Sequence, residues 1–591
     1  MSSETKICQN CKKDFVIEPE DFKFYEKIKV PPPTWCPECR MVRRFTVRNE
    51  RSLYKREESL HNREVISMYS SDKPFIVYHH NDWWSDGWNP MQYGFNYDFS
   101  KTFFEQFRKL LELVPALALS NVNPVNSEYC NFADGNKNCY LCFGAGFNEG
   151  VSYSTRVGKS KDSMDLLGCV ENELCYDNVS CSTCYQLFYG MNCKNCVSSY
   201  FLYNCKNCTD CVGCVNLINK SNYIFNKPYT KEDYQKKIKE LNLDSREGLS
   251  KVRKEFENIL STAVRRYGDF INSPKSTGDH IFNSKNCRLC FDILGNAEDC
   301  ANLFHSYNLK DSYDGMGLYK TELSYENVDT NFNARLLSSV TVYHCNNVSY
   351  SSNCHSSNNL FACIGLRSKS YCILNKQYTK EEYEKLVPRI IEHMNQMPYI
   401  DQKGRVYKYG EFFPPELSPF AYNETIVQEY FPLTKEEAIE KGYSWKDPEP
   451  RNYKIQIPND KLPDHIKDVK DDIVGQVIEC GHKGKCNEQC TEAFKIIQPE
   501  LDFLRKMSLP LPRLCPNCRH YQRIKQRNPL KLWKRKCQCA GAKSDNQIYA
   551  NTVDHIHHKK EEHCLNEFET TYAPERPEIV YCEACYLREV V

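Results

Sequence analysis

The sequence predicts a mainly β protein with additional α-helices, in which parallel β-helix or solenoid-like, Cys-rich repeats are flanked by zinc-ribbon-like modules. Three observations lead to this expectation. Cysteine pairs with metal-ligand spacing occur near both ends of the chain. Between them, a unit of roughly one hundred residues, within the usual size range of a domain, occurs twice. Inside the first unit, Cys-x2-Cys pairs begin at Cys181, Cys193 and Cys205, among short β-rich segments.

Composition narrows the compartment and the classes of partner. The chain has 591 residues and a formal net charge of +1, so any attraction to nucleic acid must come from local patches. The first residues are charged, and no run of about 18 apolar residues occurs, so neither secretion nor a membrane span is expected. We therefore expect a cytoplasmic protein. In that compartment, 34 cysteines point to metal binding rather than to disulfides.

The first element is an N-terminal zinc module with a basic helix, residues 1–60. Its predicted metal ligands are two Cys-x2-Cys pairs, Cys8, Cys11, Cys36 and Cys39. Four thiolates suit structural zinc, because a catalytic site keeps one position open. A basic segment follows, and if it is helical its cationic side chains share one face; they are Arg40, Arg44, Arg48, Arg51 and Lys55. Such a stripe suits phosphate. Alternatively, these arginines pack on aromatic rings and pair with Glu50, Glu57 and Glu58.

The middle of the chain is divided by its repeats. Residues 61–128 form a Trp-rich connector with an amphipathic helix, and residues 129–234 form solenoid unit 1. A helical linker, residues 235–277, leads to solenoid unit 2, residues 278–383. NKNCYLCF in the first unit resembles SKNCRLCF in the second, and CVNLINKSNYIFNKPYTKEDY resembles CIGLRSKSYCILNKQYTKEEY. Both units end in a capping signal that should start a helix, at Thr230 and at Thr379.

The repeat cysteines allow two interpretations. If two 12-residue segments make one rung, Cys181 and Cys184 stack under Cys205 and Cys208, and four sulfurs could bind zinc or an iron–sulfur cluster. Otherwise, small buried thiols fill the corners of the solenoid as hydrophobic side chains. We favour the second interpretation, because a repeat protein does not need a metal in every rung.

A second zinc module with a basic segment, residues 476–536, follows a helical and Pro- and aromatic-rich connector, residues 384–475. Its expected ligands are Cys486, Cys490, Cys515 and Cys518, which repeat the spacing of the N-terminal module. The basic residues repeat as well, since Arg519, Arg523 and Arg527 match the earlier stripe. Pro529 should interrupt this helix. The match extends beyond the cysteines, so the two modules look like copies of one unit.

A C-terminal zinc ribbon, residues 537–591, closes the chain. Cys564, Cys582 and Cys585 are expected to bind its metal, with His557 as the fourth ligand. His558, Cys539, Cys537 and His555 are alternatives for that position. A further site is also open, because two pairs flank the second zinc module; they are Cys480 with His482, and Cys537 with Cys539. We expect two to four structural Zn²⁺ ions per chain.

Several long motifs resemble a family of large Cys-rich zinc-ribbon proteins from uncultivated, reduced-genome bacteria. They are CPECRMVRRFTVRNERSLYKR, WWSDGWNPMQYGFNYDFSKTFFEQF, KNCYLCF and FETTYAPERPEIVYCEACYLREVV. The resemblance spans nearly the whole chain. It implies zinc-binding ends around a Cys-rich repeat region and implies no particular reaction.

Three functions follow as hypotheses. The leading one is a non-enzymatic protein that binds RNA or a ribonucleoprotein through its basic zinc modules, with affinity that falls steeply with salt. The second is a protein-interaction scaffold built on the solenoid, with the zinc modules as end caps. The third is a metal- or carbohydrate-active enzyme on the solenoid. No catalytic residue is assigned, because no phosphate loop, nucleophile elbow or paired-carboxylate constellation is present.

Overall fold

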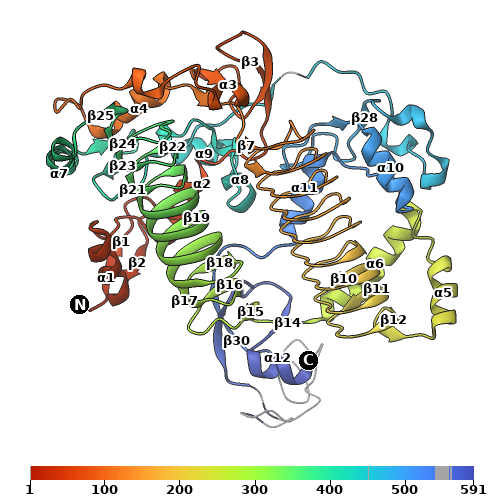
Figure 1. Ribbon diagram of the computed structural model, residues 1–591. Coiled ribbons are helices and arrows are strands. Elements are labelled where there is room, and N and C mark those ends of the chain that lie inside the picture. The colour runs from red at the N-terminus through yellow and green to blue at the C-terminus, as the bar shows by residue number, and fades with distance from the viewer. Residues whose placement is uncertain (1, 450, 540–557, 559–561, 563, 591) are drawn as a thin grey trace.

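Figure 1 shows a computed structural model in which two stacks of coiled chain lie side by side, with helices and hairpins around them. The structure describes residues 2–449, 451–539, 558, 562 and 564–590. In these ranges strand residues outnumber helical ones, and parallel pairing is more frequent than antiparallel pairing. The prediction of a mainly β protein with additional helices is therefore confirmed.

The first stack, residues 121–228, is built from twelve-residue coils. Val197 partners Thr209 and Thr209 partners Ser221, so neighbouring coils are offset by twelve positions. The same offset runs through single parallel bridges earlier in the stack. Its strands are β7 (Asn121–Val122), β8 (Ala133–Asp134), β9 (Tyr185–Phe188), β10 (Val197–Tyr203), β11 (Thr209–Val215) and β12 (Ser221–Ile224). One coil thus takes twelve residues, and the expectation of two such segments per rung was wrong.

The backbone explains this short period. After Asn138, whose φ is 52°, the left-handed conformation recurs at every third residue, at Leu141, Gly144, Phe147 and Gly150. Each of these residues turns the chain, so four three-residue sides close one coil. A left-handed backbone is unfavourable for residues other than glycine. Hydrogen bonds between coils offset that cost, as where the amide of Asn138 donates to the carbonyl of Val125 at 2.8 Å.

The residue after each corner points into the coil and is buried. In one coil these residues are Cys139, Cys142, Ala145 and Asn148. Inward positions are three residues apart, which is why the sequence shows Cys-x2-Cys pairs. The thiols act as weak donors to the next coil; Cys142 Sγ, for example, donates to the carbonyl of Val151 at 3.2 Å. Cysteine is thus used here as a small, slender core residue.

The second stack, residues 270–377, has the same construction. Val340 partners Ser352, twelve positions on, but Cys287 partners Cys300, so one coil carries an additional residue. Its strands are β15 (Phe270–Ile271), β16 (Gly278–Phe282), β17 (Lys285–Arg288), β18 (Cys290–Ile293), β19 (Ala297–Leu337), β20 (Val340–Tyr343), β21 (Asn346–Ser349), β22 (Ser352–His355), β23 (Asn358–Phe361) and β24 (Ser370–Ile373).

Both stacks end in the same way. A short antiparallel strand, β13 (Lys227–Pro228) or β25 (Lys376–Gln377), pairs with the last coil and leads into a capped helix. The helices are α5 (Lys231–Glu240) and α7 (Lys380–Gln396). The caps are the predicted ones, since the hydroxyls of Thr230 and Thr379 accept hydrogen bonds from amides at the third helical position.

Three modules built on hairpins and helices surround the stacks. The N-terminal module contains β1 (Glu4–Ile7), β2 (Asp14–Ile17), α1 (Pro19–Ile28), α2 (Pro37–Phe45), β3 (Tyr54–Glu57) and β4 (Glu64–Ser67). The second module repeats this order with β28 (Ile478–Glu479), β29 (Ala493–Phe494), α10 (Gln498–Lys506), α11 (Pro516–Lys525) and β30 (Trp533–Lys536). The third contains β31 (Glu567–Thr570), β32 (Ile579–Tyr581) and α12 (Glu583–Glu589).

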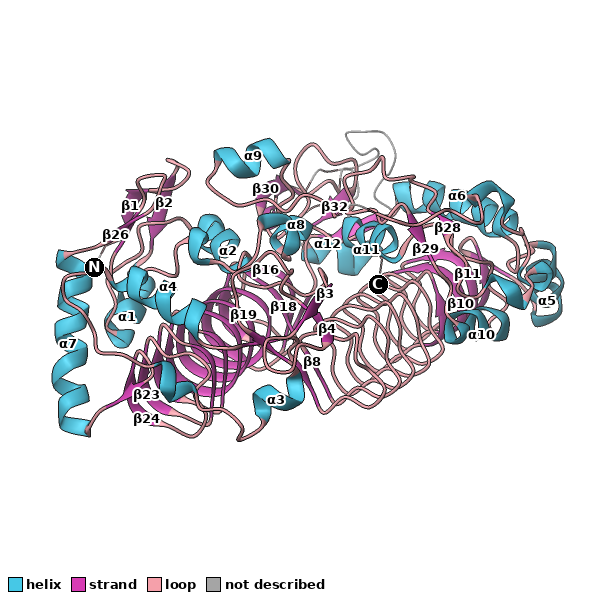
Figure 2. Ribbon diagram, turned by 90° about the horizontal axis from the view of Figure 1, so that it is seen from above, coloured by secondary structure: helices cyan, strands magenta, loops and turns pink. Residues whose placement is uncertain are grey.

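Helices of the N-terminal module and of the connecting segments cover the sides of the stacks. Figure 2 shows α1 and α2 beside the second stack and α6 beside the first. The connectors contain β5 (Val77–Tyr78), α3 (His80–Trp84), η1 (Pro90–Tyr93), α4 (Phe103–Leu113), β6 (Ala116–Leu117), α6 (Arg246–Thr262), β14 (Val264–Arg266), β26 (Tyr399–Ile400), β27 (Val406–Tyr407), η2 (Pro415–Leu417), η3 (Tyr422–Glu424), α8 (Val427–Tyr430), α9 (Lys435–Glu440), η4 (Asn459–Lys461), η5 (Ile466–Asp468) and η6 (Asp471–Ile473).

Candidate metal centres

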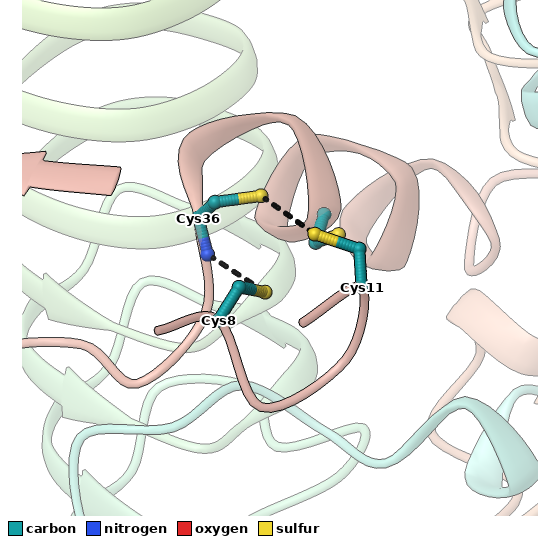
Figure 3. Close-up of side chains that lie close together, drawn as sticks. Cys8, Cys11 and Cys36 are labelled. Atoms are coloured by element: carbon teal, nitrogen blue, oxygen red, sulfur yellow. Dashed lines mark hydrogen bonds between the residues drawn. The ribbon is translucent and has the colours of Figure 1, made fainter. Parts of the chain in front are cut away.

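Four cysteines of the N-terminal module meet in one group, and Figure 3 labels three of them, Cys8, Cys11 and Cys36. Cys8 and Cys11 come from the turn between β1 and β2, and Cys36 and Cys39 from the start of α2. Cys36 Sγ lies 3.8 Å from Cys11 Sγ, and the Cys36 amide donates to Cys8 Sγ at 3.2 Å. A tetrahedral zinc ion with Zn–S bonds of about 2.3 Å separates its sulfurs by about 3.8 Å. The four predicted ligands therefore lie together with spacing that fits a metal ion.

The second module forms an equivalent group, with one correction to the expected ligands. Cys480, rather than Cys486, joins Cys490, Cys515 and Cys518. Cys480 directly follows β28, as Cys8 directly follows β1, and the Cys515 amide donates to Cys480 Sγ at 3.2 Å. A longer loop between the first two ligands hides this equivalence in the sequence. The cysteine that directly follows the first strand was the signal that could have shown it.

The third group is made of Cys537, Cys564, Cys582 and Cys585. The Cys582 amide donates to Cys537 Sγ at 3.2 Å, and Cys564 Sγ lies 3.8 Å from Cys582 Sγ, which repeats the geometry of the N-terminal group. His557, the expected fourth ligand, lies outside the described residues. Cys537 makes the group four-membered without it.

Each group also contains one thiol with a strongly lowered pKa. Hydrogen bonds from Cys36 and Cys39 lower the pKa of Cys8. Cys515 and Cys582, at the first position of the later knuckles, are lowered in the same way by cysteines of their own groups. The thiolate is the form that binds a metal. Sulfur separations of 3.8 Å are also far beyond the roughly 2.05 Å of a disulfide.

Two smaller clusters adjoin the second and third groups. His482, Cys486 and Glu488 lie beside Cys518, and Cys539 and His558 lie beside Cys585. The idea that Cys480, His482, Cys537 and Cys539 form one further site is therefore corrected. The structure divides them between two modules.

The repeat cysteines do not form such groups. Among the described residues, the clusters with metal-ligand spacing contain cysteines of the three modules only. Inside the first stack, Cys181 and Cys193 are buried, and burial raises the pKa of both thiols. This outcome agrees with the interpretation that the repeat cysteines fill the coils as core residues.

Most of the predicted basic stripe of the N-terminal module does not face solvent. α2 ends at Phe45, so the later members of the stripe lie beyond the helix and do not share its face. Arg40 and Arg44 are buried and pair with Asp314 at 2.9 and 3.1 Å. Arg48 is also buried and pairs with Glu50 at 2.7 Å, as the alternative interpretation proposed. These three guanidinium groups therefore form ion pairs with carboxylates of the protein itself and do not face solvent, where phosphate would bind.

Arg43, which the sequence analysis did not single out, completes this buried network. It pairs with Glu326 at 2.8 Å and with Glu411 at 2.9 Å, and Arg44 reaches Glu326 at 2.7 Å. Glu326 and Asp314 belong to the second stack. No motif distinguishes these carboxylates from the many other acidic residues of the repeats, so they were not singled out as partners of the arginines.

The stripe of the second module is buried in the same way. Arg519 pairs with Asp165 at 2.6 Å, and Arg523 pairs with Asp165 at 2.9 Å. Arg527 pairs with Asp292 at 2.5 Å. α11 ends at Lys525, before Pro529, as expected for a helix that a proline interrupts.

Two members of the first stripe remain. Arg51 is mostly buried and donates to Thr155 Oγ1 at 3.0 Å; burial lowers the pKa of its guanidinium. Lys55 lies in β3, its side chain is 71% exposed, and it pairs with Glu64. Of the eight residues predicted to contact nucleic acid, Lys55 alone is exposed.

The modules dock crosswise on the stacks. The N-terminal module places α2 on the second stack, through Asp314, whereas the second module places α11 on the first stack, through Asp165. When the two repeat units are aligned so that Cys214 matches Cys363, Asp165 matches Asp314. An aromatic contact repeats as well, because Phe24 meets Tyr325 as Phe503 meets Tyr176. Repeated modules therefore make repeated contacts, each with the stack that is more distant from it in the sequence.

The segments after the helices reach the opposite stack. Arg527 pairs with Asp292 of the second stack, and Glu50 lies 3.5 Å from Arg156 of the first. Arg51 also contacts Asn517 of the second module. Each basic segment thus contacts both stacks, and together the two segments hold the stacks in place.

A polar cavity of about 170 Å³ lies where the first stack, the second stack and the third module meet. His280 and Asp269 line it, with Nδ1 of His280 3.3 Å from Asp269 Oδ2. Burial alone would lower the pKa of His280, but Asp279 and Asp269 outweigh it and raise the pKa to about 9.

Comparisons with known proteins give no assignment beyond this geometry. The chain matches no known protein family, and no curated protein is detectably similar to it. In the described part of the chain, no helix is both long enough and apolar enough to cross a membrane. The buried arginine network and the three cysteine groups are therefore the features of the described residues that bear most directly on function.

Proposed function

We propose that this protein is a non-enzymatic cytoplasmic scaffold, in which three structural zinc modules brace two short-period parallel β-solenoids. The observation that carries this proposal is the crosswise docking of α2 and α11. Their arginines pair with buried carboxylates of the stacks, for example Arg44 with Glu326 and Arg523 with Asp165. The knuckles fix the position of these helices, so the metal would fix the position of the stacks.

Zinc suits the chemistry of the three groups. Each offers four cysteine sulfurs, and soft thiolate ligands in a tetrahedron favour zinc over hard cations such as magnesium or calcium. Four protein ligands leave no open position for a substrate. The resemblance to the Cys-rich zinc-ribbon family fits this structural role.

A scaffold fits the exposed surfaces better than an RNA-binding protein does. The early coils of the first stack carry matched charges on their solvent-facing side, such as Lys137 with Glu149 at 2.8 Å. The later coils carry ladders of neutral amides, in which Asn195 donates to Asn207 and Asn207 to Asn219. A binding surface for nucleic acid would instead carry an excess of unpaired cations. These sides suit polar contacts with a protein partner.

Metal removal tests the bracing role. A strong chelator should increase the radius of gyration measured by small-angle X-ray scattering, while the β signal in circular dichroism persists, because the coils close through their own hydrogen bonds. Cys8→Ser should weaken the bracing in the same direction, and Cys193→Ala, inside a coil, is the matched control that should not. Unchanged dimensions after complete metal removal would contradict the proposal.

RNA binding tests the competing function. Titration of the holo-protein with mixed-sequence RNA at salt concentrations of about 50 and 200 mM should show no tight, salt-dependent binding. If such binding occurs and Lys55→Glu abolishes it, the zinc modules bind nucleic acid and the scaffold is not their main function.

A further inference from the structure

We infer that the second module holds two metal ions that share the thiolate of Cys518. One ion would occupy the group formed by Cys480, Cys490, Cys515 and Cys518. The other would be held by His482, Cys486, Glu488 and the same Cys518. This inference rests on metal occupancy of the first group, which is part of the proposed function, and adds a second, mixed-ligand site of the kind that suits zinc.

The distances within the second cluster are those of a coordination shell. His482 Nδ1 lies 3.2 Å from Cys486 Sγ and 3.1 Å from Glu488 Oε2. Cys486 Sγ lies 3.7 Å from Cys518 Sγ. With Zn–N and Zn–O bonds of about 2.1 Å and Zn–S bonds of about 2.3 Å, the edges of a tetrahedron measure about 3.4 to 3.8 Å. The three separations are therefore within a few tenths of an ångström of such edges, and all four ligand atoms lie within 4.8 Å of one another.

Glu488 provides an independent observation. Its side chain is buried, and Oε2 has no hydrogen-bond donor, although it points at the cluster. Lys525 holds the other oxygen, Oε1, and thereby fixes the carboxylate. A buried carboxylate oxygen without a donor is costly. A cation between His482, Cys486 and Cys518 would satisfy it.

The other two modules show which feature makes the shared site. In the third module, Cys585 corresponds to Cys518, and a second cluster adjoins it: His558 Nε2 lies 3.3 Å from Cys585 Sγ and 3.7 Å from Cys539 Sγ. In the N-terminal module, the corresponding Cys39 instead accepts a hydrogen bond from Asn10 Nδ2 at 3.3 Å. Within the described residues, no second cluster adjoins Cys39. The N-terminal module is therefore a natural single-ion control.

Metal counting by native mass spectrometry, supported by elemental analysis, tests the inference on the full-length holo-protein. The double variant His482→Gln, Cys486→Ser should contain one zinc ion fewer than the unmodified protein. Cys490→Ser, in the group of four cysteines, reports on the proposed function instead. Equal zinc content in the double variant and the unmodified protein would overturn the shared site and leave the proposed function intact. Zinc absent from all three modules would overturn both.

Cobalt substitution covers the case in which a variant fails to fold. Two Co²⁺ ions bridged by one thiolate are magnetically coupled, so the unmodified protein should show a smaller electron paramagnetic resonance signal per cobalt than isolated ions give. The coupling between the two cobalt ions of the second module should disappear in the double variant. The sulfur-to-cobalt charge-transfer absorption of the group of four cysteines in that module should persist. A full, uncoupled signal for every bound cobalt in the unmodified protein would contradict the shared thiolate.

Discussion

Replacing Glu326 by Gln should release the N-terminal module from the second stack. The carboxylate lies 2.8 Å from Arg43 Nη2 and 2.7 Å from Arg44 Nη1, and all three side chains are fully buried. Glutamine keeps the shape of the side chain but removes the charge. Three guanidinium groups, Arg40, Arg43 and Arg44, would then share the carboxylates of Asp314 and Glu411.

The expected loss is large because the remaining charges stay buried. Two unit charges roughly 4 Å apart interact by about 4 kcal/mol at an effective dielectric constant of about 20. Removal of one partner from a buried ion pair costs about 3–5 kcal/mol in measured cases. Glu326→Gln should therefore lower the free energy of local opening around α2 by about this amount.

Hydrogen exchange measured by mass spectrometry is the suitable assay, because a chain with several modules does not unfold in two states. Each 1.4 kcal/mol is a tenfold change, so amides of α2 should exchange roughly two to three and a half orders of magnitude faster in the variant. Glu64→Gln is the control; Glu64 pairs with Lys55 at 2.9 Å, but both side chains are mostly exposed, and such pairs contribute less than about 1 kcal/mol. If both variants change exchange by less than tenfold, the buried network does not hold the module in place.

Three further outcomes are expected. Cys196→Ala should leave the zinc content unchanged, as measured by elemental analysis, and lower stability by no more than about 2 kcal/mol, because it removes one buried sulfur; loss of a metal ion would place a site in the coils. Burial alone would raise the pKa of Asp292, but Arg527 outweighs it and lowers the pKa to about 2. The ionised Asp292 therefore stabilises the fold above pH 4 and loses this contribution as the pH falls toward 2. The melting temperature of Asp292→Asn should depend less on pH in that range. His280, with a pKa raised to about 9, stabilises the fold fully below pH 6.5 and loses its contribution as the pH rises to 9; His280→Asn should flatten the decline in melting temperature across that window, and an identical decline in both proteins would contradict this assignment.

Local patterns in the sequence predicted local structure well. The knuckles Cys36-x2-Cys39 and Cys515-x2-Cys518 lie where their spacing indicated, and Thr230 and Thr379 cap the expected helices. Each of these features depends on a few residues that are close together in the chain. A short stretch of sequence was therefore enough to predict its structure.

Features that depend on distant residues were harder to predict. Cysteine spacing is compatible with two coil lengths, and only the left-handed residue at every third position distinguishes them; at Leu141 and Phe147 nothing in the residue type suggests it. The arginines were recognised as a group but their partners were not, because Asp165 and Asp314 lie more than a hundred residues away from them. A basic stripe looks the same in sequence whether it meets phosphate or buried carboxylates.

The crosswise docking also has a consequence for assembly. During synthesis, α2 is made before the carboxylates of the second stack exist, and Asp165 is made long before Arg519 and Arg523 can neutralise it. Among the residues that the structure describes, Arg44 of α2 and Arg523 of α11 pair only with carboxylates in the other half of the chain. The two halves of the chain make equivalent contacts. Two copies of a half-length chain could therefore pair their buried charges reciprocally, with the module of each copy bound to the stack of the other. A single polypeptide of this design makes within one chain the contacts that a domain-swapped homodimer makes between its two subunits.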